Sequence, residues 1–303
     1  MSIKLWEGSK QFKENSHLNA YKQWLFTNKG LEFKNYQELW QWSVTEIEDF
    51  WESIWHYFKV TSHQPYTKVL SSYEMPNSKW FEGATINYAE HLFKKAKDNE
   101  TAIIFGNETG LNQEISWLEL KTKVASLATY FKSIGVIKDD RVVAFLPNIP
   151  EATIAFLAVN SIGAIWSSTS PDFGSESVVD RFAQIEPKVL ISVDGYQYNG
   201  KPYDKSNIVN AIVDALPTLK KVLILPYLNA NALDNFPKHY ENINHIFNTV
   251  SGELTFEPVE FNHPIWVLYS SGTTGLPKAI VHSHGGILLE HLKYMAFHND
   301  VHE

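Results

Sequence analysis

The sequence predicts an α/β protein with a largely parallel sheet, preceded by a helical segment rich in aromatic residues. From residue 101 onward, short apolar runs alternate with longer stretches whose apolar residues recur at helical spacing. Within the first 80 residues, tryptophans recur among charged side chains. The chain has 303 residues, of which 44% are apolar, so it can bury a sizeable core in one large domain or two smaller ones.

The first 80 residues are expected to be helical. Between Leu39 and Phe58 the apolar residues fall largely at helical spacing, and several tryptophans lie among them. A row of tryptophans could serve as a platform for a ligand, or as a set of anchors that pack against the next domain. Large aromatic side chains are usually buried by packing, so we expect the second role. The tryptophans concerned are Trp24, Trp40, Trp42, Trp51 and Trp55.

The alternation of strands and helices begins near residue 101. Ser116 and Glu119 form a capping box at the start of a helix that extends to Gly135. Asn148 is expected to cap another helix, with Pro150 in its first turn. Such an alternation is typical of a parallel sheet with crossover helices. The expected strands are 102–105, 141–146, 189–193 and 222–225, the expected helices are 116–135, 148–164, 178–185 and 208–216, and the expected polar connections are 194–207 and 229–248.

Composition excludes several classes of function. The net charge is −8 with both signs dispersed, so no nucleic-acid partner is predicted. The absence of cysteine excludes a disulfide scaffold, a thiolate zinc site and a cysteine nucleophile. The most apolar stretch, 152–166, is too short to span a bilayer, and the N-terminus lacks the features of a signal peptide. A cytoplasmic protein without a membrane partner is therefore expected.

Five histidines near the end of the sequence raise the question of a metal site. Their spacings match no zinc-binding pattern, and no cysteine is present to complete one. We therefore expect no metal site, and structural roles are the better interpretation. These residues are His282, His284, His291, His298 and His302.

The loop between residues 269 and 278 gives the strongest indication of function. It follows the apolar segment 265–268, and the apolar pattern resumes at 279–281, so a strand, a short polar loop and a second strand are predicted. Glycines let successive backbone N–H groups face one anion, hydroxyls add donors, and a lysine supplies a charge that can follow a phosphate. The candidate phosphate-binding residues are Ser270, Ser271, Gly272, Thr273, Thr274, Gly275 and Lys278.

The loop could also be a P-loop or a hairpin that binds no ligand. The P-loop of nucleotide triphosphatases requires Gly, four residues, and then Gly-Lys-Ser/Thr. Gly272 is instead followed at those places by Pro277, Lys278 and Ala279, so the second glycine and the magnesium-binding hydroxyl are both missing. A hairpin rich in Ser, Thr and Gly that binds no ligand stays open on composition alone.

The string Ser270-Ser-Gly-Thr-Thr-Gly-Leu-Pro-Lys278 resembles the phosphate-loop signature of the adenylate-forming superfamily, which includes acyl-CoA synthetases, luciferases and adenylation domains of peptide synthetases. With its flanks, 269–286, it resembles acetoacetyl-CoA synthetases more closely than acetyl-CoA synthetases. The string Ser170-Pro-Asp-Phe-Gly174 resembles the same subfamily. The resemblance covers the whole chain, because the N-terminal region of both kinds of synthetase is similar to residues 5–7, 40–58 and 80–90.

The resemblance implies an ATP-dependent acid–thiol ligase. In the implied reaction, acetoacetate attacks the α-phosphorus of ATP to give an acyl-adenylate and pyrophosphate, and the thiol of coenzyme A then displaces AMP. The loop from Ser270 to Gly275 would hold the β- and γ-phosphates together with a magnesium ion. Lys278 would be the catalytic residue, because its charge can stabilise the departing pyrophosphate.

The same resemblance implies a division into a helical cap, 1–80, and an incomplete AMP-binding large domain, 81–303, with the C-terminal small domain absent. Members of the family are roughly twice as long, and their downstream motifs for ribose and adenine are not found here. We therefore expect a fragment without full synthetase activity. Two alternatives stay open: another short-chain acyl-CoA synthetase that acts on acetate or propionate, and a non-catalytic α/β binding module.

Overall fold

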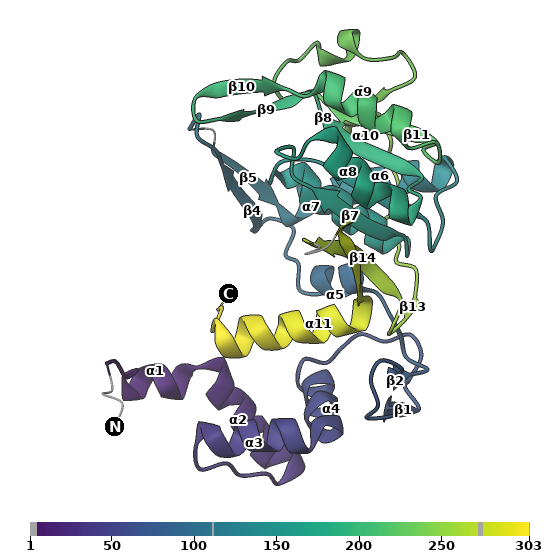
Figure 1. The fold of residues 1–303 in the computed structure, drawn as a ribbon. Helices are drawn as coiled ribbons and strands as arrows, with labels where there is room; N and C mark the ends of the chain where they lie inside the picture. Colours follow the sequence, from purple (N-terminus) through teal and green to yellow (C-terminus); the bar gives the residue numbers. More distant parts are fainter. Residues whose placement is uncertain (1–4, 111, 272–274, 303) are drawn as a thin grey trace. The chain divides into compact units, whose positions relative to one another are not determined.

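The computed structural model describes residues 5–110, 112–271 and 275–302. The chain divides into two compact units (Figure 1). The last residues of the chain belong to the same unit as the first ones, and the predicted domain boundary after residue 80 stays a prediction. The first unit comprises residues 1–85, 260–262 and 285–303, and the second comprises residues 86–259 and 263–284.

The first unit is mostly helical. The hydroxyls of Ser9 and Ser16 begin two of its helices by accepting hydrogen bonds from the backbone N–H groups of Phe12 and Asn19, at 3.1 and 3.2 Å. Gly30, with φ +68°, ends the second helix in the left-handed conformation that glycine adopts readily. The elements are α1 (Lys10–Asn15), α2 (His17–Lys29), α3 (Tyr36–Thr45), α4 (Ile47–Tyr57), β1 (Lys68–Leu70), β2 (Trp80–Glu82), α11 (His284–Lys293) and the π-helix η3 (Tyr294–His298). The first residue of α11, His284, belongs to the second unit.

Aromatic rings fill the interior of the first unit. Trp55 is buried and stacks on Phe81, with ring centroids 4.6 Å apart. Tyr21 is fully buried, stacks on Phe297 at 4.6 Å, and hydrogen-bonds through its hydroxyl to Ser53. Burial raises the pKa of Tyr21, so its hydroxyl stays protonated. The predicted helical, aromatic-rich N-terminal region is confirmed. The rings pack together inside this unit, and the expected packing of the tryptophans against the next domain stays a prediction.

A seven-stranded sheet forms the centre of the second unit, in the order β12-β11-β8-β6-β7-β14-β15. Neighbouring strands are parallel except in the last pair, where β15 runs antiparallel to β14. The predicted α/β fold with a largely parallel sheet is therefore confirmed. The strands are β6 (Arg141–Phe145), β7 (Ile165–Thr169), β8 (Val189–Val193), β11 (Lys221–Leu225), β12 (Glu241–Asn242), β14 (Pro264–Ser270) and β15 (Lys278–Ser283).

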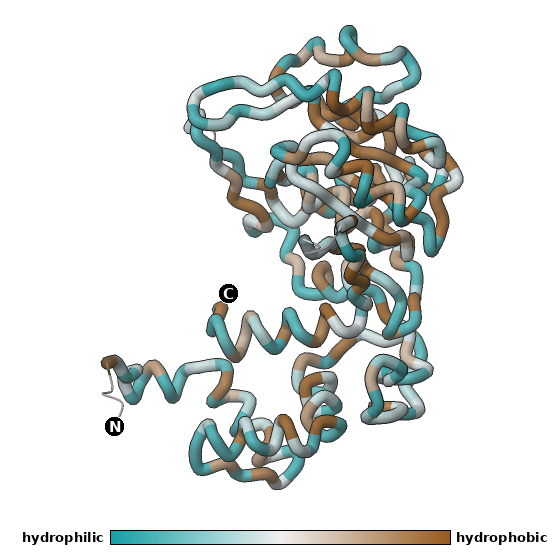
Figure 2. The backbone as a smooth tube through the Cα atoms, viewed as in Figure 1, coloured by the Kyte–Doolittle hydropathy of each residue, from teal (hydrophilic) through white to brown (hydrophobic). Residues whose placement is uncertain are grey.

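Helices cover both faces of this sheet. Val142 and Ala144 of β6 pack in one buried cluster with residues of α5, α6, α7 and α10, whereas Val143 and Phe145 pack in a second cluster with residues of α8 and α9. Since successive side chains of a strand point to opposite faces, the two clusters lie on opposite sides of the sheet. Figure 2 shows hydrophobic residues, in brown, along the strands and helices of this interior. The helices are α5 (Tyr88–Phe93), α6 (Trp117–Ser133), α7 (Pro150–Ser161), α8 (Ser175–Phe182), the short 3-10 helix η1 (Ala183–Ile185), α9 (Ser206–Ala215) and α10 (Ile243–Thr249).

One of the two predicted helix caps in this unit is correct. Ser116 accepts a hydrogen bond from the backbone N–H of Glu119 at 3.2 Å and caps α6. The prediction for Asn148 is wrong, because α7 begins at Pro150 and its N-cap residue is Ile149, which makes no side-chain capping bond. Pro150 has no backbone N–H group, so the first turn of this helix has one hydrogen-bond donor fewer that needs an acceptor.

The segment 194–207 contains a hairpin where the sequence predicted an exposed loop. β9 (Gly195–Tyr198) pairs antiparallel with β10 (Lys201–Asp204). Tyr196 and Tyr203 lie opposite each other, with their rings stacked and the centroids 5.5 Å apart. Cross-strand aromatic pairs stabilise short hairpins even in a polar sequence. The expected polar connection 229–248 contains the 3-10 helix η2 (Ala232–Asn235), β12 and most of α10. The other short elements are β3 (Thr85–Ile86), β4 (Thr101–Gly106), β5 (Asn112–Ser116) and β13 (Val259–Glu260).

Asn87 joins three segments of the second unit. Its buried side chain donates from Nδ2 to the backbone carbonyls of Asn160 and Glu257, at 2.9 and 3.0 Å. Its Oδ1 accepts hydrogen bonds from the N–H groups of Ala89 and Glu90 and so caps α5. One side chain therefore connects the start of α5, the end of α7 and the segment before β13.

We expect Asn87→Ala to lower the free energy of unfolding by about 2 to 4 kcal/mol, because it removes a helix cap and leaves two buried carbonyl groups without this donor. Asn242→Ala is the matched control. Asn242 caps α10 through one hydrogen bond, from the N–H of Asn244 at 2.9 Å, so its loss should cost about 1 kcal/mol. Urea denaturation followed by circular dichroism measures both variants. Equal losses would contradict the connecting role of Asn87.

Candidate functional site

The carboxyl ends of the parallel strands lie at one edge of the sheet. β7 and β14 are parallel neighbours, and the buried hydroxyl of Ser167 donates a hydrogen bond to the backbone carbonyl of Val267 at 2.7 Å. The turn 170–174 follows β7, and the loop 271–277 follows β14. In open α/β sheets this edge is where ligands commonly bind. The two motifs that the sequence singled out therefore lie at the same edge.

The predicted phosphate loop connects β14 to β15. Ser270, at the end of β14, pairs with Lys278, at the start of β15. Ser271, Gly275 and Lys278 are exposed to solvent, and Ser270 is half-buried. The predicted succession of strand, loop and strand is confirmed, and the binding roles of its residues stay predictions. The members of the predicted set that lie outside the described residues are Gly272, Thr273 and Thr274.

A strand, and not a helix, follows this loop. In a P-loop the following helix contributes the partial positive charge of its N-terminus to phosphate binding. Here Lys278 is the first residue of β15, and within the described part of the chain no carboxylate pairs with its ammonium group. Gly275 has φ +146°, a conformation that suits glycine, and no atom lies within 4 Å of the place where a Cβ would be. The described part of the loop therefore has an accessible backbone at Gly275 and a lysine charge without a described carboxylate partner, and both features suit an anion.

Two hydrogen bonds connect the ends of the loop to an upstream helical segment. The hydroxyl of Tyr269 donates to the backbone carbonyl of Arg181 at 2.7 Å, and Nε2 of Gln184 donates to the carbonyl of Pro277 at 3.0 Å. Burial raises the pKa of Tyr269 to about 12, so the phenol stays a donor. Sequence reasoning missed this support, because the partners are 88 and 93 positions apart and follow no local pattern.

The turn after β7 is fixed by its own side chains and by the β9–β10 hairpin. Ser170 donates to the carboxylate of Asp172 at 2.7 Å, and the hydroxyl of Tyr196 donates to the same group. The hydrogen bond from Tyr196 holds the pKa of Asp172 below its usual value. The guanidinium of Arg181 lies 4.7 Å from the ring centre of Phe173. These contacts are enough to account for a structural role of this turn.

Thr169, the last residue of β7, is a further candidate that the sequence did not distinguish from its neighbours. Its side chain is buried, and within the described part of the chain its Oγ1 has no hydrogen-bond partner. A buried hydroxyl without a partner costs about 1 to 3 kcal/mol. A ligand atom at this edge of the sheet could satisfy it.

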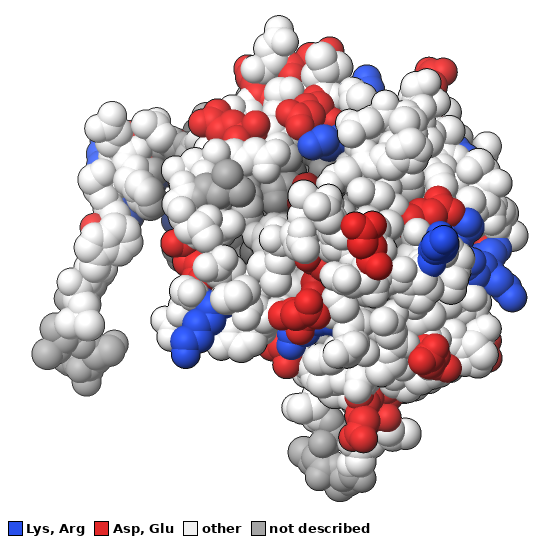
Figure 3. Space-filling view, turned by 90° about the horizontal axis from the view of Figure 1, so that it is seen from above, with Lys and Arg blue, Asp and Glu red and all other residues white. Residues whose placement is uncertain are grey.

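Charged side chains of both signs occur on the face of the molecule that Figure 3 draws. The face drawn in Figure 3 carries acidic and basic residues separated by uncharged ones. Charges of both signs are therefore dispersed on this face, as the sequence indicated for the chain. None of the helices in the described part of the chain is both long and apolar enough to cross a membrane.

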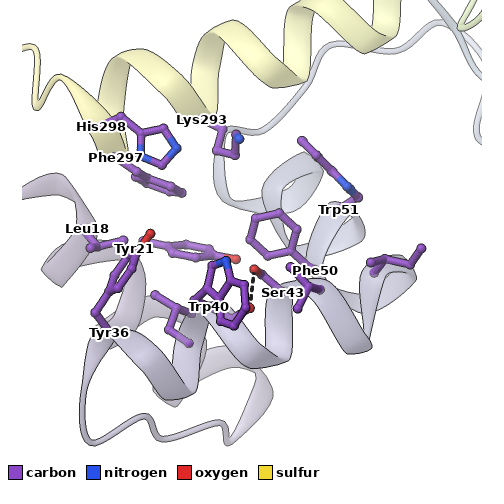
Figure 4. A pocket seen from close by; sticks show the side chains of 13 residues that line it. Leu18, Tyr21, Tyr36, Trp40, Ser43, Phe50, Trp51, Lys293, Phe297 and His298 are labelled. Atoms are coloured by element: carbon purple, nitrogen blue, oxygen red, sulfur yellow. Dashed lines mark hydrogen bonds between the residues drawn. The ribbon is translucent and has the colours of Figure 1, made fainter.

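A cavity of about 510 Å³ lies within the first unit (Figure 4). Its lining is mostly apolar and includes the rings of Trp40, Phe50 and Trp51. The ammonium of Lys293 lies 5.5 Å from the ring centre of Trp51 and forms an ion pair with Glu290 at 3.0 Å. None of the described residues of the predicted phosphate loop is among the residues that line this cavity.

The contacts of His282 and His284 support the structural roles that the sequence predicted. Nδ1 of His282 accepts a hydrogen bond from the indole N–H of Trp266 at 2.9 Å. Nδ1 of His284 accepts one from the backbone N–H of Tyr88 at 3.3 Å. Burial, assisted by the neighbouring His263, lowers the pKa of His284 to about 3, so this imidazole is neutral at physiological pH.

Comparison with known proteins places the chain in a class of enzymes. The AMP-binding enzyme family matches residues 90–302, and the acetyl-coenzyme A synthetase N-terminus family matches residues 36–92. The first match covers more than half of the chain, so the chain belongs to the AMP-binding enzyme family. The predicted resemblance to adenylate-forming enzymes is thereby confirmed.

Individual relatives narrow the resemblance to one subfamily. The acetoacetyl-CoA synthetase of Gallus gallus is 38% identical over 309 residues, which cover 98% of this chain and 46% of that protein. The acetoacetyl-coenzyme A synthetase of Rhizobium meliloti (strain 1021) is 38% identical over 298 residues, which cover 97% of this chain and 45% of that protein. The solved structure of acetoacetyl-CoA synthetase from Streptomyces lividans matches 99% of this chain with a TM-score of 0.95 and 41% identity. The chain spans about half the length of these relatives.

The pKa of His284 predicts a dependence of stability on pH. In the folded protein this imidazole stays neutral down to about pH 3, whereas in the unfolded chain it binds a proton near pH 6.5. The unfolded state then binds more protons, so the free energy of unfolding should fall as the pH decreases below 6.5. His284→Gln should reduce this slope, and the remaining slope should include His91, whose pKa burial lowers to about 4. Urea denaturation at several pH values gives the slope.

The exposed His239 provides the matched control for this measurement. His239→Gln controls for the substitution itself, because folding does not bury this side chain. A wild-type slope that His284→Gln leaves unaltered would contradict the neutral, buried imidazole.

Proposed function

We propose that the chain is part of an acetoacetate–CoA ligase, which activates acetoacetate with ATP and transfers the acyl group to coenzyme A. The observation that carries this proposal is that relatives named acetoacetyl-CoA synthetase align with 97 and 98% of the chain. The structural likeness supports it over the same extent, with a TM-score of 0.95. The cytoplasmic location expected from the sequence is part of the proposal.

The chemistry has two steps. A carboxylate oxygen of acetoacetate forms a bond to the α-phosphorus of ATP, and the bond from this phosphorus to the oxygen that bridges to the β-phosphate breaks, which releases pyrophosphate. The sulfur of coenzyme A then bonds to the acyl carbon, its proton passes to solvent, and AMP leaves. The first step concentrates negative charge on pyrophosphate, so a positively charged loop at that place lowers its barrier.

The described residues of the loop fit this task. Lys278 offers an exposed ammonium without a carboxylate partner in the described part of the chain. Ser270 and Ser271 add hydroxyl donors, and Gly275 leaves the backbone accessible. Gly272, Thr273 and Thr274 complete the proposed set from their place in the sequence. A magnesium ion bound with ATP would supply further positive charge to the phosphates.

A second candidate function has a specific observation in its favour. Residues 36–92 match the acetyl-coenzyme A synthetase N-terminus family. Acetate or propionate is therefore the alternative substrate, with the same two steps. The reaction class is shared, and only the acyl pocket distinguishes the two candidates.

The substrate comparison tests the proposed function directly. A full-length ligase that contains this chain should form its CoA thioester from acetoacetate with a kcat/KM higher than that for acetate or propionate by about tenfold or more, since a pocket that pairs the ketone oxygen discriminates strongly. Preference for acetate or propionate would establish the alternative. Absence of AMP formation with all three acids would contradict the ligase.

Lys278→Ala tests the role of the lysine. In the same full-length ligase, we expect adenylation to slow by about 10² to 10³-fold, the cost of removing one donor to a developing charge. Because the charge develops on the departing pyrophosphate, the affinity for ATP should fall much less. Isotope exchange between pyrophosphate and ATP gives the rate, and calorimetric titration with ATP and magnesium gives the affinity.

Lys220→Ala is the matched control for this test. Lys220 is also exposed. It directly precedes β11 and so lies at the amino ends of the parallel strands, whereas the loop follows the carboxyl end of β14. It should change neither quantity. If Lys278→Ala left the exchange rate unchanged, or slowed adenylation and thioester formation equally, the role of Lys278 would have to be abandoned.

A further inference from the structure

Three side chains that can bind a metal lie together in the first unit although they are far apart in the sequence. His17 is the first residue of α2, and Asp300 and His302 follow η3, with His17 and Asp300 283 positions apart. One ligand atom from each residue lies within 4.8 Å of the other two. In Figure 1 the yellow end of the chain is drawn on the same side as the purple N-terminal helices. The sequence could not reveal this cluster, because only its Asp300-Val-His302 part is local.

The carboxylate of Asp300 lies between the two imidazoles. Its Oδ1 accepts a hydrogen bond from the backbone N–H of His17 at 2.8 Å and lies 3.0 Å from Nδ1 of the same residue. Its Oδ2 lies 3.2 Å from Nε2 of His302. The backbone of Asp300 has φ +50°, which is uncommon for a residue other than glycine. The hydrogen bond from the His17 backbone also holds the pKa of Asp300 below its usual value, so the carboxylate is ionised.

These distances suit a zinc ion. Zinc binds imidazole nitrogen and carboxylate oxygen at about 2.0 to 2.2 Å in tetrahedral geometry, so the ligand atoms around it are roughly 3.4 Å apart. Each imidazole nitrogen already lies close to that separation from one oxygen of Asp300, His17 at 3.0 Å from Oδ1 and His302 at 3.2 Å from Oδ2. The ligand atoms of the two imidazoles lie within 4.8 Å of each other, so a modest movement of the side chains would bring both nitrogens to one ion. Two imidazoles and one carboxylate form a donor set that zinc accepts.

We propose that His17, Asp300 and His302 bind one zinc ion, with water in the fourth position. The ion would replace the hydrogen bonds between the carboxylate and the imidazoles. It would tie the first residue of α2 to the segment after η3 and so cross-link two parts of the first unit. This site is independent of the proposed ligase reaction.

A simpler role of Asp300 makes a different prediction. Its carboxylate accepts a hydrogen bond from the first N–H of α2, as a helix-capping group does, and this contact would stabilise the unit without any metal. His302 takes no part in that cap, and its side chain is 54% exposed. A change at His302 therefore separates metal binding from capping.

Calorimetric titration of the chain with zinc chloride tests the proposal. We expect one ion per chain, and an affinity that falls by at least about tenfold in His17→Gln and in His302→Gln, since even changes around a metal ligand have effects of this size. His239→Gln, which replaces an exposed histidine outside the cluster, should leave the affinity unchanged. Cobalt should give the visible absorption of a tetrahedral site in the wild type and not in His302→Gln.

Thermal denaturation with and without zinc gives a second measurement. Zinc should raise the Tm of the wild type, and this rise should disappear in Asp300→Asn, which should also be less stable without zinc because its cap is weakened. If His17→Gln does not fold, His302→Gln decides the question. Absence of zinc binding in the wild type, or equal affinity in the wild type and His302→Gln, would overturn the proposal.

Discussion

The need to bury both faces of a parallel sheet determines how the second unit is built. Each crossover between parallel strands requires a connection that returns over one face, and here helices provide it on both sides. Val142 and Val143, adjacent in β6, accordingly belong to different buried clusters. With both faces covered by helices, the carboxyl edge of the sheet is where short polar segments lie next to one another. The turn after β7 and the loop after β14 are neighbours for this reason.

This constraint also explains which parts of the fold the sequence could predict. A strand covered on both faces is a continuous apolar run, so β6, β8 and β11 stand out within a polar sequence. The β9–β10 hairpin lacks such a run, since its stability comes from the pairing of Tyr196 with Tyr203 across the strands. Asn148 illustrates a second limit. Asn148 is chemically able to cap a helix, yet α7 begins one residue later, after the apolar Ile149, so the residue type alone did not determine where the first turn begins.

The sequence likewise predicted one part of the candidate site and missed another. The composition of the loop and its flanking apolar runs indicated a strand, a turn and a strand, and the pairing of Ser270 with Lys278 agrees with that prediction. Its support by Arg181 and Gln184 was not predictable, since a backbone carbonyl and a side-chain amide in a distant helical segment leave no periodic signal. The first unit shows the same limit more strongly. Phe297 stacks on Tyr21 and Asp300 meets His17, contacts that depend on the chain returning to its start.

The strand after the loop changes how an anion can be held there. When a helix follows a glycine-rich loop, several aligned peptide groups share the compensation of phosphate charge, and a lysine adds to a field that already exists. β15 offers no such field, because the dipoles of paired strands largely cancel. In the proposed role of this loop, the compensation would come from local N–H groups, from hydroxyls and from the ammonium of Lys278, which the pairing with Ser270 places at the start of β15. In this proposal the positive charge is therefore concentrated in one ammonium, on the long and flexible side chain of a lysine. Such a group would follow a leaving group as its charge develops, whereas a fixed dipole would act on the bound and the departing phosphate alike.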